Sequence, residues 1–244
     1  MKFVIKKVNE VEAIRRRLPE AIEIEGEVPT EDFRIFLSRQ AREKIFIAGS
    51  HNPDGMAASL YRRENERGGV LLGNLYYDEV NGKKITYTAI TDAMPADDAQ
   101  AGSTHVEFDG GMLKKVMEEA SDYIQKTGQN ARIVGWYHTH PGFGVFMSGT
   151  DQNTQRQIYG TDWHIAIVFD PIRRDYGIFY GKDSTPATGW CIFDLIAEGF
   201  PPPMKLRLRV NNTQNRQVEE DFFQLKEALF EEFREMFDPI KDVI

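Results

Sequence analysis

Two histidines separated by one residue, His138 and His140, constrain this chain more than any other feature of its sequence. In an extended strand, residues i and i+2 point to the same face, so both imidazoles can aim at one point. Pro141 ends the strand pairing because it has no N–H to donate. Ser148 and Asp151 then predict the start of a helix that brings a carboxylate back toward the histidines. Two imidazoles and one carboxylate with an open fourth position make a catalytic zinc site.

Each half of this pattern also has a simpler interpretation. A single His-x-His pair on a strand is more often packed than metal-binding, and Ser148 could merely cap a helix by bonding the N–H of Asp151, which reaches back. Two histidines and a carboxylate also form the facial triad of non-haem iron oxygenases, although that class usually places its carboxylate where this chain has His140. The complete order His-x-His-Pro-x6-Ser-x-x-Asp makes chance a poor explanation, so the zinc site is the favoured interpretation.

In this complete form the pattern resembles the JAMM (MPN/JAB-domain) zinc metalloproteases, a family that includes isopeptidases acting on ubiquitin and ubiquitin-like proteins. The family also uses a glutamate ahead of a Gly-apolar-apolar-apolar-Gly run, and Glu66 precedes such a run, which ends at Gly73. Glu64 lies nearby, and composition alone does not choose between the two glutamates. The family spacing selects Glu66, which the resemblance implies is a general base. It also implies that Ser148 hydrogen-bonds the developing oxyanion.

The resemblance implies an α/β fold, an MPN (JAB) domain whose curved mixed β-sheet packs against helices. We expect this domain over residues 31–196, an N-terminal extension over 1–30, and a C-terminal extension over 197–244 that contains an amphipathic helix. The apolar residues of that helix recur at a spacing of three or four: Val218, Phe222, Leu225, Leu229, Phe233 and Met236. We expect this stripe to pack on the same domain or on a second copy in a homodimer, with docking of a partner protein as the alternative.

Recognition of the modifier's tail in this family resembles β-augmentation, in which an extended C-terminus pairs with an edge strand. A polar insertion expected over 92–103, with the short strand after it, would supply that edge, which makes His105 and Phe108 candidate substrate-binding residues. Gly142 and Gly144 leave room beside the metal for the small residues that end ubiquitin-like tails. The expected partners are therefore ubiquitin or a ubiquitin-like protein and its conjugates.

Composition and charge limit the remaining function classes. The chain has 244 residues, of which 41% are hydrophobic and 28% charged, as in an ordinary globular protein. A net charge of -8 argues against general nucleic-acid binding, and no apolar run approaches the roughly 18 to 20 residues that a membrane span needs. The single cysteine, Cys191, excludes an internal disulfide framework and a cysteine-based zinc site. The cytoplasm is the expected location.

Periodicity and turn residues predict the elements around the motif. Ser38 is expected to cap a helix that ends near Ala48, and Asn81-Gly82 is the expected turn of a hairpin. The basic residues 15–17 are expected on a solvated helix face, with binding of an acidic partner as the alternative. The expected strands are 33–37, 68–77, 84–90, 105–108, 133–140, 164–170 and 176–181, and the expected helices after the first are 112–125 and 152–159.

Together these features favour a zinc-dependent isopeptidase or processing protease for ubiquitin-like modifiers. A catalytically silent scaffold with the same fold is the alternative hypothesis, and the intact set of site residues argues against it. By analogy, the compact chain suggests a bacterial ubiquitin-like conjugation operon, including one that serves phage defence.

Overall fold

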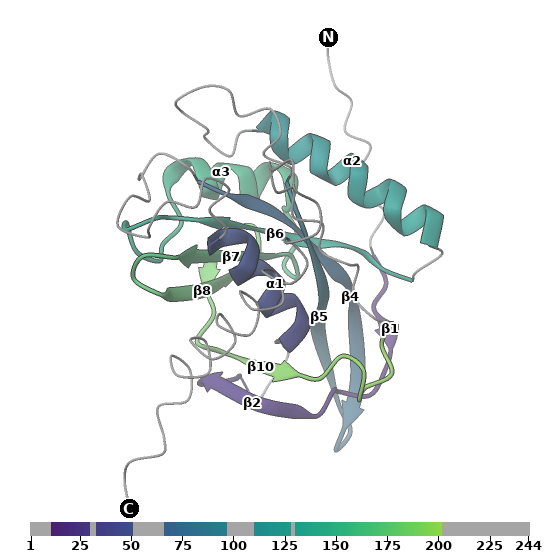
Figure 1. The fold of residues 1–244 in the computed structure, drawn as a ribbon. Coiled ribbons are helices and arrows are strands. Elements are labelled where there is room, and N and C mark those ends of the chain that lie inside the picture. The colour runs from purple at the N-terminus through teal and green to yellow at the C-terminus, as the bar shows by residue number, and fades with distance from the viewer. Residues whose placement is uncertain (1–10, 30–32, 51–65, 97–109, 128–129, 202–244) are drawn as a thin grey trace, which may run out of the picture. The chain divides into compact units, whose positions relative to one another are not determined.

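The structure, a computed structural model, describes residues 11–29, 33–50, 66–96, 110–127 and 130–201. Its strands are β1 (Ile14–Arg15), β2 (Ala21–Gly26), β3 (Phe33–Ser38), β4 (Gly68–Val80), β5 (Lys83–Pro95), β6 (Arg132–Thr139), β7 (Ile165–Asp170), β8 (Asp175–Tyr180), β9 (Thr185–Pro186) and β10 (Gly189–Phe193). The helices in these ranges are α1 (Arg39–Ser50), α2 (Gly110–Thr127) and α3 (Gly149–Ile158). Figure 1 shows the helices arranged around the sheet.

The strands form one mixed sheet in the order β2-β10-β3-β5-β4-β6-β7-β8-β9, with β1 paired to β4. The β4–β5 hairpin turns at Asn81 and Gly82, as predicted, and both residues have positive φ angles of 53° and 76°. Such angles are required by the tight turns that match the twist of two antiparallel strands. The β6–β7 pair is parallel, and a helix, α3, lies between these strands in the chain. This crossover places the start of α3 near the end of β6, where the two histidines lie.

The first predicted strand and helix are confirmed, and the local reason is visible. Ser38 ends β3, and its hydroxyl accepts a hydrogen bond from the Ala41 N–H at 3.1 Å. This is the capping contact expected of a serine ahead of a helix. The helix then runs two residues beyond its predicted end, to Ser50.

The prediction that a polar insertion begins at Asp92 is wrong, because β5 continues to Pro95. Residues 97–103 of the expected insertion lie outside the described residues. Asp92 is only 5% exposed, and its carboxylate is paired with the ammonium group of Lys44 on α1. A buried carboxylate requires such a partner, and this pair ties α1 to β5. The polarity of Asp92 therefore reflects a buried ion pair, not a solvated loop. The substrate-binding candidates His105 and Phe108 lie outside the described residues.

The sheet receives strands from both ends of the described chain. β2 pairs with β10, and β1 pairs in parallel with β4, so part of the range expected as an N-terminal extension belongs to the sheet. The strand expected over 176–181 is present as β8, but it is not the last strand of the sheet, because β9 pairs beyond β8 and β10 inserts between β2 and β3. The expected C-terminal helix lies outside the part of the chain that the structure describes.

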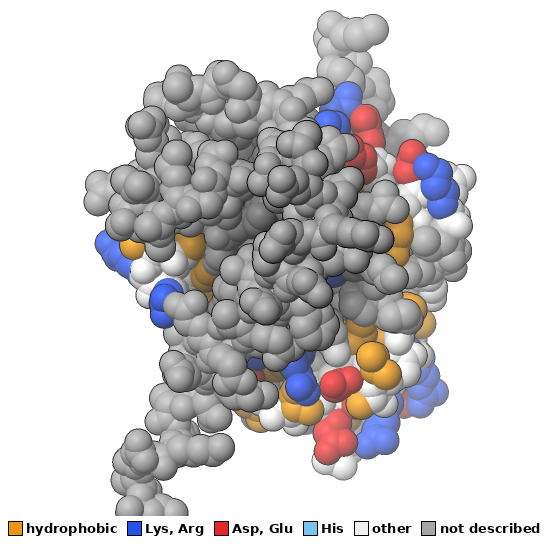
Figure 2. Space-filling model, viewed as in Figure 1, with side chains coloured by type: hydrophobic (Ala, Val, Ile, Leu, Met, Phe, Trp, Pro, Cys, Tyr) orange, Lys and Arg blue, Asp and Glu red, His pale blue; other side chains and the backbone are white. Residues whose placement is uncertain are grey.

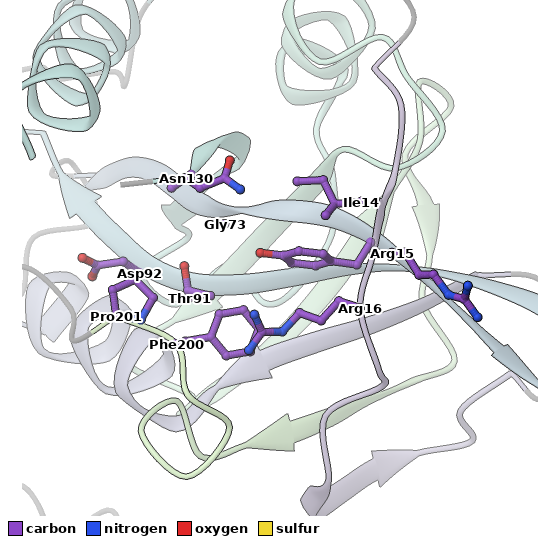
Figure 3. Close-up of a pocket in the computed structure, with 11 residues that line it drawn as sticks. Ile14, Arg15, Arg16, Gly73, Thr91, Asp92, Asn130, Phe200 and Pro201 are labelled. Carbon is purple, nitrogen blue, oxygen red and sulfur yellow. The ribbon is translucent and has the colours of Figure 1, made fainter. Parts of the chain in front are cut away.

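The basic residues near position 16 do not form the predicted helix face. Arg15 lies on β1, and the guanidinium of Arg16 stands 3.7 Å from the centre of the Phe200 ring while donating to the carbonyl oxygen of Glu198. Figure 3 shows Arg16 and Phe200 at the edge of a pocket of about 200 Å³, which Asp92 also lines. Arg16 thus packs and hydrogen-bonds within the fold.

On the face shown in Figure 2, the described acidic and basic side chains are interspersed and do not gather by sign. No helix in the described ranges is long and apolar enough to cross a membrane.

One hydrophobic cluster forms the floor beneath the histidines. Val116 and Ala120 of α2 pack with Val70 of β4 and Trp136 of β6, and all four are at most 2% exposed. Because side chains alternate along a strand, Trp136 and the histidine two residues later face the same side of the sheet. The histidines thus project from the edge of a packed core, which restricts their movement.

Candidate metal centre

The end of β6 brings the two histidines together. Their Nε2 atoms lie 3.0 Å apart, and His138 and His140 are 1% and 3% exposed. Thr139 between them is fully buried and, by the alternation of the strand, faces the opposite side of the sheet. The strand geometry expected from the His-x-His spacing is therefore present.

The first turn of α3 supplies the carboxylate. Ser148 is the N-cap: its hydroxyl accepts from the Asp151 N–H at 3.2 Å, and the Asp151 Oδ2 accepts from the Ser148 N–H at 2.7 Å. The same carboxylate lies 3.3 Å from the Nε2 of His138 and 3.4 Å from the Nε2 of His140. The capping box and the metal-ligand interpretation of Ser-x-x-Asp are thus compatible, because the cap orients the carboxylate toward the imidazoles.

The spacing of these atoms fits a metal ion. The two Nε2 atoms lie 3.0 Å apart, the Asp151 Oδ1 lies 3.3 Å from the Nε2 of His138, and the Asp151 Oδ2 lies 3.4 Å from the Nε2 of His140. With one ligand atom taken from each residue, all three lie within 4.8 Å of one another. A tetrahedral zinc ion with bonds of about 2.0 to 2.1 Å holds its ligand atoms about 3.3 Å apart. The three residues are the buried group of metal-ligating side chains found in the described part of the chain. They therefore suit a four-coordinate ion with one position left for water or substrate.

The electrostatics of the cluster favour a cation. Burial would raise the pKa of Asp151, but hydrogen bonds from His138 and His140 and the charge of His138 hold it well below its usual value. Burial would lower the pKa of His140, but its hydrogen bond to Asp151 and the charges of Asp151 and Glu66 raise it. Both shifts show that the site stabilises an ionised carboxylate beside positive charge. A divalent ion would supply that charge.

The register of the sheet places Glu66 beside the histidines. β4 pairs antiparallel with β6, and Gly68 stands opposite His138. Residues opposite each other on neighbouring strands share a face, so Glu66, two residues before Gly68, falls on the face of His140. Glu66 is partly buried, and its charge contributes to the raised pKa of His140. The structure therefore brings Glu66 to the cluster, whereas Glu64 lies outside the described residues.

A glutamine that the sequence did not single out fixes the position of His138. The imidazole of His138 stacks on Trp136, with ring centres 4.5 Å apart and planes 11° apart. The indole N–H of Trp136 donates to the Oε1 of Gln155 at 2.7 Å, and the amide of Gln155 donates to the Gly181 carbonyl at 3.2 Å. Gln155 is one helical turn after Asp151 and on the same face of α3. The four-residue spacing from Asp151 is the sequence feature that could have identified Gln155.

The remaining histidine in the described ranges has a structural role. His164 lies with its Nδ1 2.7 Å from the hydroxyl oxygen of Thr161. Burial lowers the pKa of His164 to about 4. His164 is thus a neutral, hydrogen-bonded histidine that directly precedes β7.

The comparison with known protein families agrees with this geometry. Residues 54–161 match the family model described as JAB1/Mov34/MPN/PAD-1 ubiquitin protease. That range contains Glu66, both histidines, Ser148 and Asp151. The chain contains an MPN/JAB domain.

Curated relatives match this chain over short stretches. The 26S proteasome non-ATPase regulatory subunit 14 of Caenorhabditis elegans is 47% identical over 53 residues, which cover 21% of this chain and 17% of that protein. Ubiquitin carboxyl-terminal hydrolase RPN11 of Saccharomyces cerevisiae is 43% identical over 53 residues, with the same two shares of 21% and 17%. COP9 signalosome complex subunit 5 of Caenorhabditis elegans is 38% identical over 85 residues, or 34% of this chain and 21% of that protein. The matches thus span about a fifth of the length of these relatives.

Among solved structures, the solution structure of a protein from Desulfitobacterium hafniense aligns with a TM-score of 0.42 at 16% identity. The alignment covers 66% of this chain and 93% of that one. The fold assignment to the MPN/JAB domain, with its curved mixed sheet, rests on the family match and on the strand order described above.

A buried aspartate anchors the loop between the two halves of the MPN motif. The side chain of Asp170 is fully buried. Its carboxylate accepts from the N–H groups of Gly142 at 2.8 Å and Gly144 at 2.7 Å, and from those of Ile172 and Arg173. Gly142 and Gly144 have φ angles of 81° and 89°, which favour glycine. The two glycines are therefore needed to shape the loop, and the room that they leave for substrate stays a prediction.

We expect Asp170→Asn to destabilise the protein by about 1 to 3 kcal/mol. The new side-chain NH2 group would face backbone N–H donors, which would then lose their charged acceptor. Burial would raise the pKa of Asp170, but the N–H bonds from Gly142, Arg173 and Gly144 lower it. A carboxyl with a lowered folded pKa contributes stability above its unfolded pKa of about 4, and that contribution is lost as the pH falls through the folded pKa. Denaturant unfolding should therefore give a lower free energy of unfolding for the variant than for the unmodified protein at pH 7, and this difference should become smaller as the pH falls.

The matched control is Asp175→Asn, at the exposed start of β8, which should change the free energy of unfolding by less than about 0.5 kcal/mol. Equal unfolding free energies for Asp170→Asn and the unmodified protein at pH 7 would show that the loop does not depend on this carboxylate.

Proposed function

We propose that this chain is a zinc-dependent isopeptidase that removes or processes ubiquitin or a ubiquitin-like modifier. The observation that carries the proposal is the buried set of His138, His140 and Asp151, whose ligand atoms lie within 4.8 Å of one another, with Glu66 on the same face. One matched relative is named a ubiquitin carboxyl-terminal hydrolase, which supports the choice of substrate class.

The proposal gives each site residue a role, and the placement of that residue supports the role. A zinc ion held by the two histidines and Asp151 would polarise the amide carbonyl and lower the pKa of water to about 7. Glu66, beside His140, would accept a proton from the attacking water and pass it to the departing amine. The Ser148 hydroxyl accepts from the Asp151 N–H, so its own proton can be donated to the oxyanion that forms on the carbonyl.

Two phenylalanines support a binding surface for an extended substrate. Phe143 and Phe146 are 49% and 45% exposed, and the Phe146 ring centre lies 4.7 Å from that of His140. A groove of about 480 Å³ is lined by Phe146, by Pro186 of β9 and by Trp190 of β10. Exposed aromatic side chains beside a reactive centre are typical of protein-binding surfaces.

We further propose that the glycines at 142 and 144 admit the small residues at a modifier's C-terminus, and that His105 and Phe108 contact the same tail. Partners would be the modifier and its conjugates, and a homodimer or partner protein bound through the C-terminal helix. The cytoplasm and a bacterial conjugation operon stay predictions, and a ubiquitin-like gene beside activating and conjugating enzymes in the genome would support the second.

The test is cleavage of defined isopeptide conjugates by the zinc-loaded chain. We expect kcat/KM for a folded ubiquitin-like conjugate to exceed that for a peptide carrying only the last few tail residues, because a folded modifier adds contacts that offset the ordering of its tail. A chelator should abolish cleavage, and added zinc should restore it. Equal kcat/KM values for the two substrates would favour a general peptidase, and no cleavage of either would refute the proposal.

A further inference from the structure

The residue between the two histidines makes a pair of hydrogen bonds to the residue after Glu66. The Thr139 Oγ1 accepts from the Arg67 N–H at 2.8 Å, and the Thr139 N–H donates to the Arg67 carbonyl at 2.7 Å. Thr139 is fully buried. Its side chain points away from the imidazoles, yet it fixes the backbone directly next to Glu66.

These bonds lie where the regular β4–β6 ladder ends. The last paired residues are Gly68 and His138. At the next position an antiparallel ladder would use two backbone carbonyls as acceptors, but here the threonine hydroxyl replaces one of them. The hydroxyl therefore extends the pairing by one residue, up to the peptide that joins Glu66 to Arg67.

Two further contacts hold the segment around Arg67 and Thr139. The Gly68 carbonyl accepts from the Ala96 N–H at 2.9 Å. The methyl group of Thr139 lies so close to Gly49 of α1 that a Cβ there would stand 2.9 Å from it. Thr139 thus contacts α1 through its methyl group and Arg67 through its hydroxyl, so the two groups can be separated by substitution.

We propose that Thr139 is a positioning residue, which sets the distance between the Glu66 carboxylate and the metal ligands through the Arg67 backbone. The inference rests on the proposed function, in which Glu66 transfers the proton. Because Thr139 lies between the two histidines, one residue couples the strand that carries the ligands to the segment that carries the base.

The test replaces the hydroxyl and the methyl group separately in the full chain. Thr139→Val keeps the shape but removes the acceptor, and we expect kcat to fall about tenfold, the effect of one hydrogen bond, with KM and zinc content unchanged. Thr139→Ser keeps the hydroxyl and should recover most of the lost kcat. If the valine variant does not fold, kcat of Thr139→Ala is compared with that of Thr139→Ser. Both variants lack the methyl group, so they differ only by the hydroxyl.

Two further measurements distinguish positioning from general stability. Amide hydrogen exchange of the metal-free protein should show loss of protection at Arg67 in Thr139→Val, but not at Gly135 within the same ladder. In a Glu66→Gln background, Thr139→Val should change the residual rate by less than about twofold, because effects that act through one group do not add.

An additive tenfold loss in the Glu66→Gln background, or an unchanged kcat in Thr139→Val, would overturn the inference. If Glu66→Gln alone leaves the rate unchanged, the proposed role of Glu66 fails, and the inference fails with it. The two failures are therefore distinguishable.

Discussion

Purified protein is expected to contain one zinc ion per chain, and the His138→Ala and Asp151→Ala variants are each expected to lose most of it. Catalytic zinc sites use three protein ligands, and this site offers three buried ones whose ligand atoms lie within 4.8 Å of one another. Removing one leaves two protein ligands and two positions that only water can fill. Elemental analysis after gel filtration measures the loss, and hydrolysis should fall to the uncatalysed background.

Ser148→Ala is the matched control for the Asp151 variant, because Asp151 has two functions. Both residues belong to the capping box of α3, but only Asp151 approaches the histidines. Losing the capping hydroxyl should cost about 1 kcal/mol of stability while zinc stays bound. Hydrolysis should fall about 10² to 10³-fold if the hydroxyl also stabilises the oxyanion. Iron in the purified protein, or full zinc occupancy in a His138→Ala/Asp151→Ala double variant, would contradict the assignment.

The geometry around the histidines was predictable because it depends on local spacing. Strand alternation requires His138 and His140 to share a face, and a capping box requires Ser148 and Asp151 to stand three residues apart. Both rules act within a few residues of the chain. The motif also predicted that the helix returns its carboxylate to the histidines. The crossover between the parallel strands β6 and β7 is what brings the two elements together, and local spacing does not give that pairing.

Other features depend on partners that are distant in the chain, and pattern alone missed them. Asp92 looked like the start of a loop because its partner, Lys44, lies 48 residues earlier on another element. Asp170 accepts hydrogen bonds from N–H groups 26 and 28 residues before it. Almost every residue carries a backbone N–H, so residue type does not identify these donors. The position of β10 between β2 and β3 was missed for the same reason. Pairing between strands that are distant in the chain depends on the packing of the whole fold.

The position of Glu66 combines both situations. Composition could not separate it from Glu64, and the family spacing was needed to select it. The structure gives an independent reason, because Gly68 pairs with His138 and so sets which residues of the preceding segment face the ligands. The register of β4 against β6 thus places Glu66 on the face of the ligands, which residue type alone could not predict.

Glu66→Gln is expected to retain fold and zinc but to lower kcat by about 10² to 10⁴-fold, the usual contribution of a general base. The amide has the shape of the carboxylate and cannot accept the proton from water. Because Glu66 is not among the three ligand residues, zinc content should stay at one per chain. Single-turnover cleavage of an isopeptide conjugate measures the chemical step separately from binding.

Glu79→Gln is the matched control for this variant. Glu79 lies near the far end of β4, the strand that begins two residues after Glu66, and it is exposed and pairs only weakly with Arg15 at 3.4 Å. Its neutralisation should leave kcat within about twofold of the unmodified protein, because an exposed ion pair contributes less than about 1 kcal/mol. A near-normal kcat for Glu66→Gln would instead show that proton transfer does not use this carboxylate, and Glu64 would become the residue to test.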